Sequence, residues 1–356
     1  MEPDTSRGDQ VINYKNIYHM LAYAFQVLNE GGYKKVLTES FENTAELLAA
    51  ILCKGVSKQI KRGLVKDYIP KEESLASPRG KILVSESIKT QSIRKKQLVC
   101  SYDDFTVNAY NNRIIKTTFD ILLKSDISKS RKKDIKRLLV YFGDVEILDK
   151  HNINWNQKFN RNNQTYQMLI YVCYLVIKGL LQTQSNGTTK LMEFFDEQRM
   201  CRLYEKFILE YYRKHYSPQL KASSSQIGWA LDDGYSVMLP TMQSDIMLSK
   251  GDKTLIIDAK YYAHNTQVQY DVHTIHSNNL YQIFTYVKNK ATEGGEVAGM
   301  LLYAKTDAII QPDNTYMMSG NKISVTTLDL EGEFTDISGK LDKIVKEYFG
   351  LDKNGR

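Results

Sequence analysis

Apolar residues recur three and four positions apart along much of the N-terminal half of the chain, a spacing that places them on one face of a helix. Four stretches show this pattern: residues 12–28, 44–61, 111–124 and 166–181. Shorter strand-like runs lie between them at residues 63–70 and 82–84. This half of the chain is therefore predicted to fold as a mainly helical α+β domain.

A different order of patterns follows the polar, glycine-containing segment from Gln182 to Lys190. An amphipathic helix is predicted over residues 193–215, and after it come three strands, a helix and two more strands. Their predicted ranges are 234–239, 242–249, 254–262, 277–290, 297–303 and 323–328. Such an order is typical of an α/β core with mixed strand pairing. We therefore predict two domains, residues 1–185 and 190–356.

The run MQSDIMLSKGDKTLIIDAKYY, residues 242–262, predicts a β-hairpin. Two strand-like segments flank the tetrad KGDK, which is typical of a turn. Asp258 comes directly after three apolar residues, Leu255 to Ile257, which indicates the end of a buried strand. A carboxylate at such a position is seldom without a function.

The turn also predicts the register of this hairpin. If Ser249 and Thr254 close the loop, Asp245 and Asp258 lie directly opposite each other, because the numbers of paired residues keep a constant sum. Side chains alternate along a strand, so Lys260 projects from the same face as Asp258. Two carboxylates and one ammonium group are therefore predicted to meet on one patch of the sheet.

This patch has the composition of a magnesium site. Facing carboxylates repel each other and favour a bound cation, and Mg²⁺ typically takes one or two carboxylates, waters and substrate phosphates. We predict Asp245 and Asp258 as ligands, with the Ala259 carbonyl as a further oxygen. Lys260 would orient a water or stabilise charge on a phosphate, the chemistry of phosphodiester hydrolysis. The alternative is an exposed strand pair with a salt bridge.

Three further polar residues are predicted to assist. Glu205 lies about 120° from the centre of the apolar stripe on its predicted helix, so it either approaches the metal or faces solvent. Gln282 and Tyr286 are four positions apart on the helix after the hairpin and share a face. They would bind a phosphate or hold Lys260 in place; the alternative is that they are ordinary surface residues.

Composition narrows the class of protein. The 48 Lys and Arg residues exceed the 41 Asp and Glu residues, a net charge of +7 that permits a polyanionic partner. The four cysteines are far apart with no CxxC pair, which disfavours a zinc ribbon or a disulfide framework. The polar N-terminus does not resemble a signal peptide, and no apolar run is long enough to cross a membrane. We expect a cytoplasmic protein.

The sequence has neither GxxxxGK[ST] nor GxGxxG, so any nucleotide hydrolysis would need another subunit.

Several motifs, in order along nearly the whole chain, resemble those of the McrC family, and the Asp-x(n)-Asp-x-Lys pattern resembles the PD-(D/E)xK nuclease core. The matching segments are NIYHMLAYA at 16–24, RGKI at 79–82, NRIIK at 112–116, RNN with Tyr166 at 161–166, LYEKF at 203–207, Asp245 with DAKYY at 258–262, and NLYQ at 279–282. Ser244 stands where relatives can have Thr, and relatives can have Gln at the position of Glu205.

The resemblance implies the nuclease subunit of a McrBC-type, modification-dependent (5-methylcytosine) restriction system. A separate McrB-like AAA+ GTPase hexamer would bind GTP and recognise double-stranded DNA with modified cytosine. This chain would dock on that ring through its N-terminal domain, stimulate GTP hydrolysis and cut DNA with Mg²⁺ at Asp245, Asp258 and Lys260.

Two other functions stay open. The chain could be a non-catalytic activator of the AAA+ partner, although an activator has no need for two facing carboxylates. It could also be a stand-alone PD-(D/E)xK repair nuclease, although the large N-terminal domain counts against that. A stand-alone nuclease would cut DNA without GTP or a second protein.

Overall fold

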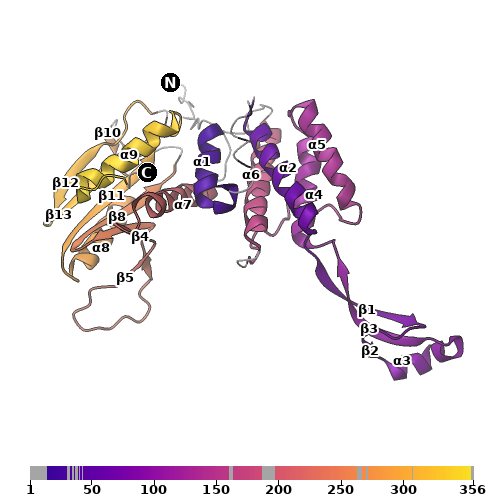
Figure 1. The fold of residues 1–356 in the computed structure, drawn as a ribbon. Helices are drawn as coiled ribbons and strands as arrows, with labels where there is room; N and C mark the ends of the chain where they lie inside the picture. The colour runs from indigo at the N-terminus through magenta and orange to yellow at the C-terminus, as the bar shows by residue number, and fades with distance from the viewer. Residues whose placement is uncertain are drawn as a thin grey trace. The chain divides into compact units, whose positions relative to one another are not determined.

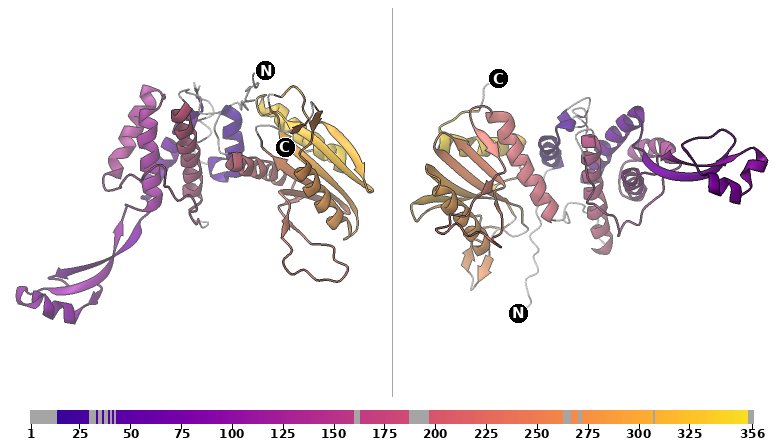
Figure 2. Two further views of the ribbon diagram at one scale, coloured as in Figure 1. Left: turned by 180° about the vertical axis from the view of Figure 1, so that it is seen from behind. Right: turned by 90° about the horizontal axis from the view of Figure 1, so that it is seen from below.

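The computed structural model describes residues 14–29, 33, 36, 39, 41, 43–159, 163–186, 197–262, 267–269, 272–306 and 308–353 (Figures 1 and 2). The chain folds into two compact units. Unit 1 comprises Met1–Leu47 together with Lys178–Arg356, and unit 2 comprises Leu48–Ile177. The helices α2 and α6 each pass from one unit into the other.

Unit 2 combines helices with a small antiparallel sheet. Its elements are α2 (Thr44–Arg62), β1 (Asp67–Leu75), β2 (Lys81–Ile82), α3 (Val84–Lys89), the 3₁₀ helix η3 (Ser92–Lys95), β3 (Leu98–Thr106), α4 (Tyr110–Lys124), α5 (Lys129–Leu139), η4 (Val140–Phe142) and α6 (Gln164–Asn186). The helices predicted at 44–61, 111–124 and 166–181 are confirmed as α2, α4 and α6. The strand β3 pairs with both β1 and β2, and the sequence patterns did not predict it.

A buried polar cluster joins the helices of unit 2 to the start of its sheet. The side-chain amide of Asn112 donates to the carbonyl of Val65 at 2.8 Å and accepts from the hydroxyl of Tyr166 at 2.9 Å. The Tyr166 hydroxyl in turn accepts from the backbone amide of Val65 at 3.0 Å. Because buried polar groups need partners, this cluster fixes α4, α6 and the chain after α2 in one arrangement.

Unit 1 contains a mixed sheet with helices on both faces. Its elements are α1 (Tyr14–Ala24), η1 (Gln26–Asn29), α7 (Glu197–Tyr216), β4 (Lys221–Ser223), β5 (Gln226–Ile227), β6 (Met242–Gln243), β7 (Ile246–Lys250), β8 (Lys253–Lys260), β9 (Gln267–Gln269), β10 (Val272–Thr274), α8 (Ser277–Ala291), β11 (Glu296–Ala304), β12 (Asn314–Met318), β13 (Asn321–Leu328) and α9 (Phe334–Phe349). Among the described residues, six strands pair in the order β12-β13-β11-β8-β7-β4. The strand β11 is parallel to β8 and β13, and the other pairs are antiparallel. The predicted α/β class with a mixed sheet is confirmed.

The two faces of this sheet are covered by different helices. The helix α8 packs closely on β11, where a Cβ atom at Gly299 would lie only 2.7 Å from Ile283 Cγ1 and 2.8 Å from Val287 Cγ2. On the other face, α9 reaches β8 through a hydrogen bond from the Tyr348 hydroxyl to the Thr254 carbonyl at 3.3 Å. The helix α7 packs on β4, β7 and β8 and is joined to α9 by a hydrogen bond from Tyr211 to Asp342 at 2.8 Å.

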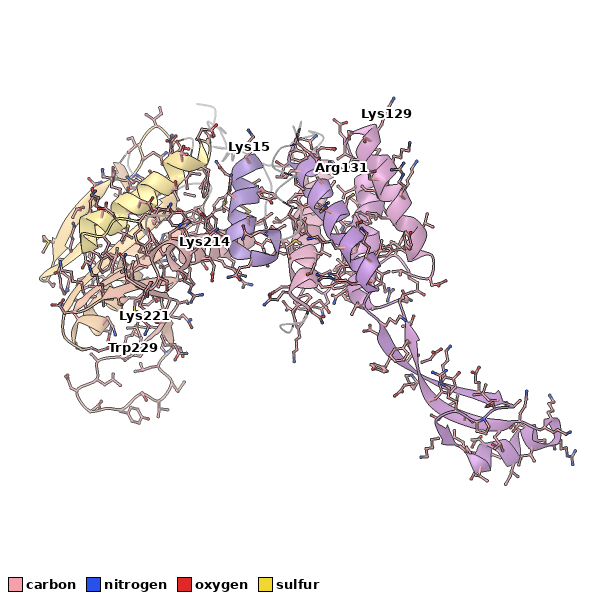
Figure 3. All side chains as sticks on the ribbon, in the orientation of Figure 1. Lys15, Lys129, Arg131, Lys214, Lys221 and Trp229 are labelled. Atoms are coloured by element: carbon pink, nitrogen blue, oxygen red, sulfur yellow. The ribbon has the colours of Figure 1, made fainter. Side chains whose placement is uncertain are left out.

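The compact units differ from the predicted division at residues 185–190, because the N-terminal helix belongs with the sheet. The Tyr23 ring of α1 contacts rings of α7, with centroids 5.5 Å from those of Phe207 and Tyr211. The ammonium group of Lys214, also on α7, lies 5.0 Å from the centroid of the Tyr23 ring (Figure 3). The amide of Asn16 donates to the carbonyls of Leu330 and Gly332, both at 2.8 Å. The predicted boundary segment lies partly outside the described residues.

Three strand predictions need correction. The run at 82–84 is strand only at Ile82, because β2 ends there and α3 begins at Val84. Residues 234–239 form an exposed loop, in which Gly234 and Met238 have φ values of 72° and 67° that a regular strand does not adopt. The predicted strand 242–249 is interrupted at Ser244 and Asp245, so β6 pairs with β5 while β7 pairs with β8. The elements β12 and α9 were not predicted.

Candidate active site

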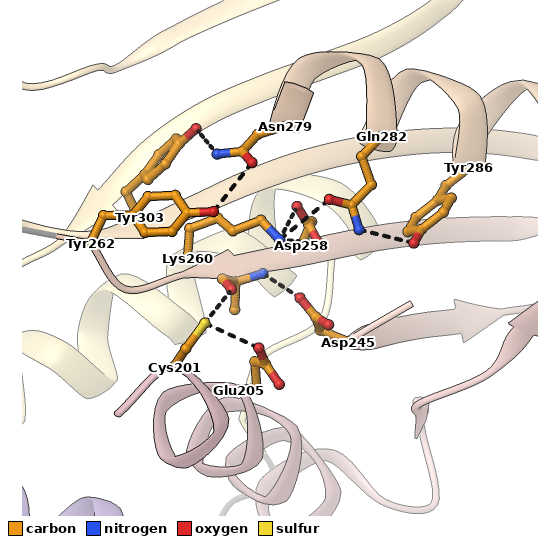
Figure 4. A network of polar contacts seen from close by, with 11 residues as sticks. Cys201, Glu205, Asp245, Asp258, Lys260, Tyr262, Asn279, Gln282, Tyr286 and Tyr303 are labelled. Atoms are coloured by element: carbon orange, nitrogen blue, oxygen red, sulfur yellow. Dashed lines mark hydrogen bonds and ion pairs between the residues drawn. The ribbon is translucent and has the colours of Figure 1, made fainter. Parts of the chain in front are cut away.

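The hairpin of β7 and β8 has the predicted register. Ser249 pairs with Thr254, and the ladder continues to the pair of Ile246 and Ile257. Asp245 lies one residue before β7, just beyond the end of this ladder. Its carboxylate Oδ2 accepts a hydrogen bond from the backbone amide of Ala259 at 3.0 Å (Figure 4). The side chain of Asp245 thereby closes the end of the hairpin.

Ser244 explains why the chain leaves the sheet at this point. Its side chain is 1% exposed, and its backbone amide donates to the Ser225 carbonyl at 3.0 Å. Its hydroxyl donates to the same carbonyl at 3.1 Å. These bonds hold residue 244 to the segment before β5, so Asp245 approaches β8 through its side chain instead of through the ladder.

Asp258 and Lys260 form a buried ion pair on the α8 face of the sheet. Asp258 is 1% exposed, and Lys260 Nζ donates to its Oδ1 at 3.0 Å. The same Nζ lies 2.9 Å from Oδ2. Among the described residues, however, no group donates a hydrogen bond of regular geometry to that buried Oδ2 atom. One carboxylate oxygen at the bottom of the site is therefore left with incomplete hydrogen bonding.

The electrostatics of the pair show a surplus of negative charge. Burial raises the pKa of Asp258, and the nearby Asp245 raises it further, against the opposing effect of Lys260. For Lys260, burial would lower the pKa, but Asp258 and Asp245 together raise it above its ordinary value. One ammonium group thus faces two carboxylates. A further cation next to the Asp258 carboxylate would stabilise its ionised form.

Glu205 and Cys201 reach the same region from α7, one turn apart. The Cys201 thiol donates to Glu205 Oε1 at 3.2 Å and lies 3.8 Å from the carbonyl oxygen of Ala259. Burial and the charge of Asp245 raise the pKa of Glu205 to about 7. Glu205 is half-buried and lies beside the candidate site. The sequence reasoning missed Cys201, although its i, i+4 spacing to Glu205 was a usable signal.

The helix α8 supplies a second set of polar contacts. The side-chain oxygen Oε1 of Gln282 accepts a hydrogen bond from Lys260 Nζ at 3.4 Å, and its side-chain Nε2 donates to the Tyr286 hydroxyl at 2.9 Å. Gln282 therefore contacts Lys260 directly, and Tyr286 extends this chain of hydrogen bonds through Gln282. Asn279, which the sequence reasoning did not assign to the site, donates to the Tyr303 hydroxyl at 2.9 Å and accepts from Tyr262 at 3.3 Å.

The oxygen atoms in the site fit a hard divalent cation that completes its coordination with other ligands. Within the described residues, no group of three or more His, Cys, Asp or Glu side chains forms a complete metal site. Asp245 and Asp258 offer carboxylates, one oxygen of Asp258 has no hydrogen bond of regular geometry, and the Ala259 carbonyl lies nearby. Two carboxylates with waters and a substrate phosphate are a normal ligand set for Mg²⁺.

The chain is similar to known restriction proteins along nearly its whole length. A family model described as McrBC 5-methylcytosine restriction system component matches residues 2–304. The type IV methyl-directed restriction enzyme EcoKMcrBC of Escherichia coli (strain K12) is 29% identical over 347 residues, which cover 95% of this chain and 98% of the relative. No helix within the described residues is both long and apolar enough to cross a bilayer.

The fold also has a counterpart among solved structures. It is similar to a chain in the refined half-complex from a tetradecameric assembly of Thermococcus gammatolerans McrB AAA+ hexamers with bound McrC. The TM-score is 0.52 at 16% identity, with 93% of this chain and 76% of that chain covered. At that identity the likeness concerns the fold alone. The match of the family model over most of the sequence decides the family: the chain belongs to the McrBC family of 5-methylcytosine restriction system components.

Proposed function

We propose that this chain is the Mg²⁺-dependent DNA endonuclease subunit of a McrBC-type restriction complex. The observation that carries the proposal is the meeting of Asp245, Asp258 and Lys260 at the end of one hairpin, where a single ammonium group lies beside both oxygens of the buried Asp258 carboxylate and a second carboxylate lies close by. Surplus buried negative charge is costly in a structural role and useful for holding a cation at a catalytic site.

The residues of the site have distinct roles in this proposal. Asp245 and Asp258 would hold Mg²⁺ together with the Ala259 carbonyl, and the ion, when bound, supplies Lewis-acid stabilisation of charge on the phosphate. Lys260 keeps its proton, because two carboxylates raise its pKa, and so presents a positive charge next to the scissile phosphate. Gln282 restrains Lys260 from α8. Glu205, with a pKa of about 7, can take up or release a proton near neutral pH.

We further propose that the chain acts together with an McrB-like AAA+ GTPase hexamer on double-stranded DNA that contains modified cytosine. The name of the E. coli relative describes a methyl-directed enzyme, and the T. gammatolerans assembly contains McrB AAA+ hexamers with bound McrC. The sequence of this chain has no phosphate-binding loop, which supports GTP binding by the partner.

A plasmid-cleavage assay tests the proposal. Wild-type protein, Asp258→Ala and Asp252→Ala would be mixed with methylated or unmethylated plasmid, with Mg²⁺ or EDTA, and with or without the GTPase and GTP. Asp252 lies at the turn of the same hairpin and provides a matched control. We expect cleavage of methylated DNA by the complete wild-type and Asp252→Ala mixtures, and its loss with Asp258→Ala or EDTA.

GTP hydrolysis by the partner, measured in the same mixtures, separates the alternatives. Stimulation of hydrolysis by Asp258→Ala without cleavage would show that the variant folds and docks, which supports a separate nuclease site. Stimulation without cleavage by the wild-type chain would identify a non-catalytic activator. Cleavage without partner or GTP would identify a stand-alone nuclease. Full cleavage by Asp258→Ala would refute the assignment of the site.

A further inference from the structure

A polar pocket lies between α9 and the sheet of unit 1, on the face opposite to Asp258. Leu255 lines it from β8, and side chains alternate along this strand, so Asp258 points the other way. The volume of the pocket is about 150 Å³. This is several times the ~30 Å³ share of one water molecule but below the ~300–1,000 Å³ of pockets for whole small-molecule ligands. The pocket thus has room for a small chemical group.

The floor of this pocket, on the side of the sheet, carries three hydroxyl groups, from a buried, a half-buried and an exposed residue. Ser324 and Thr326 of β13 line it, together with Thr315 of β12, which donates to the Ser324 hydroxyl at 3.4 Å. Thr326 is only 6% exposed, and its hydroxyl has no hydrogen-bond partner among the described residues. Sheet faces under a helix are usually apolar, and a buried hydroxyl without a partner is unfavourable. The Thr326 hydroxyl exposes almost no surface, so a polar ligand seated against this side chain would complete its hydrogen bonding once the side chain rotates toward the pocket.

The charges around the pocket favour an anion. Three lysines line it, Lys322 from β13 and Lys340 and Lys343 from α9. They outnumber the two lining carboxylates, Asp313 and Glu347, and Glu347 pairs with Lys343 at 3.5 Å. In the part of the chain that the structure describes, Lys322 and Lys340 form no ion pair. Two ammonium groups are therefore available to a ligand next to the hydroxyl floor.

We propose that this pocket binds one phosphate monoester group, either as inorganic phosphate or as the terminal phosphate of a nucleic acid strand. A phosphate fits the size of the pocket, accepts hydrogen bonds from hydroxyls on its several oxygens, and is bound well by lysine. A bridging phosphodiester offers fewer free oxygens and continues in two directions, which suits a pocket of this size less. This site is separate from the proposed nuclease site and does not depend on it.

Isothermal titration calorimetry of the full chain with inorganic phosphate, at constant ionic strength and with EDTA present, tests the proposal. We expect binding by wild type and by Asp258→Ala, which keeps this result independent of the nuclease assignment. Lys322→Gln and Lys340→Gln should each weaken binding by about tenfold or more, since each removes a charge-assisted hydrogen bond. Lys346→Gln, the same charge change on α9 outside the pocket, should bind as wild type does. Equal binding by the Lys322→Gln/Lys340→Gln double variant, or none by wild type, would overturn the proposal.

A second variant separates ligand binding from a structural role of Thr326. Thr326→Val keeps the shape of the side chain and removes the unpartnered hydroxyl. We expect weaker phosphate binding without a lower melting temperature of the free protein, whereas unchanged phosphate affinity would contradict the assigned role of this hydroxyl. Competition by an oligonucleotide with a 5′-phosphate, but not by its 5′-hydroxyl form, would assign the source to strand ends. Competition by neither form would assign the bound group to inorganic phosphate. Equal competition by both forms would refute the proposal that the pocket binds a phosphate monoester.

Discussion

Asp258 is the most deeply buried acidic or basic side chain among the described residues, at 1% exposure. Taking an ionised carboxyl group out of water is unfavourable unless another charge compensates it. Lys260 provides one compensating charge, but Asp245 places a second carboxylate within the same electrostatic environment. A lone salt bridge would need only one acid. The additional acid therefore favours the proposed cation site over the salt-bridge alternative that the sequence left open.

Glu205 should make the stability of the protein depend on pH. Its pKa rises from 4.5 to about 7 on folding, so the folded state binds a proton more tightly than the unfolded state. The resulting contribution is favourable below about pH 4.5 and is lost as the pH rises through 7. Glu205→Gln removes the ionisation, so we expect the variant to be more stable than wild type at pH 8, by on the order of 3 kcal/mol, and equally stable near pH 4.5.

Urea unfolding of both proteins without divalent ions, at several pH values between 4.5 and 8, measures this difference. Glu210→Gln on the same helix is a suitable control, because Glu210 forms an ion pair with Arg213 at the surface. A difference between Glu205→Gln and wild type that stays constant across this range would show that Glu205 does not titrate as described.

At the scale of elements, the sequence predicted the hairpin because its signals are local. The turn KGDK and the alternation of side chains were sufficient for the register of β7 and β8, which the structure confirms. They were not sufficient for the interruption at Ser244, because that residue is held by Ser225 in a segment with no strand signal. The placement of Glu205 also depended on tertiary packing, since helical spacing left its direction ambiguous. Residues 234–239 were predicted as a strand from their apolar side chains. In the structure those side chains are exposed in a loop and do not pack in a sheet.

The packing of α8 on β11 leads to a prediction about two glycines. Gly299→Ala should destabilise unit 1 by about 1–3 kcal/mol, because its Cβ would overlap Ile283 and Val287 of α8 in a filled core. Gly339 lies inside α9, and a Cβ added there would meet no atom within 4 Å, so Gly339→Ala should stabilise by about 0.5–1 kcal/mol. Chemical denaturation of both variants checks the opposite signs. A stabilised Gly299→Ala would mean that α8 is packed less tightly than described.

At the scale of the whole molecule, the N-terminal helix packs with a part of the chain that lies far from it in the sequence. Residues 14–24 are separated from α7 by the whole of unit 2 in the sequence, yet they pack on α7 within unit 1. Composition and the polar segment at 182–190 predict a boundary, but they cannot indicate that an earlier helix returns across it. The N-terminal helix belongs to the same unit as the candidate active site. Docking and cleavage therefore cannot be assigned simply to the N-terminal and C-terminal parts of the sequence.

Differential scanning calorimetry of the full chain tests this arrangement, because two compact units can unfold in separate transitions. Phe207→Ala and Phe119→Ala, both fully buried positions, identify the transitions of unit 1 and unit 2 respectively. Tyr23→Ala removes an aromatic ring that contacts Phe207, and we expect it to lower the same transition as Phe207→Ala. A loss of about 3 kcal/mol would lower that transition by roughly 6–12 °C. If Tyr23→Ala instead lowered the transition that Phe119→Ala identifies, the N-terminal helix would belong with unit 2 and the predicted boundary near residue 185 would stand.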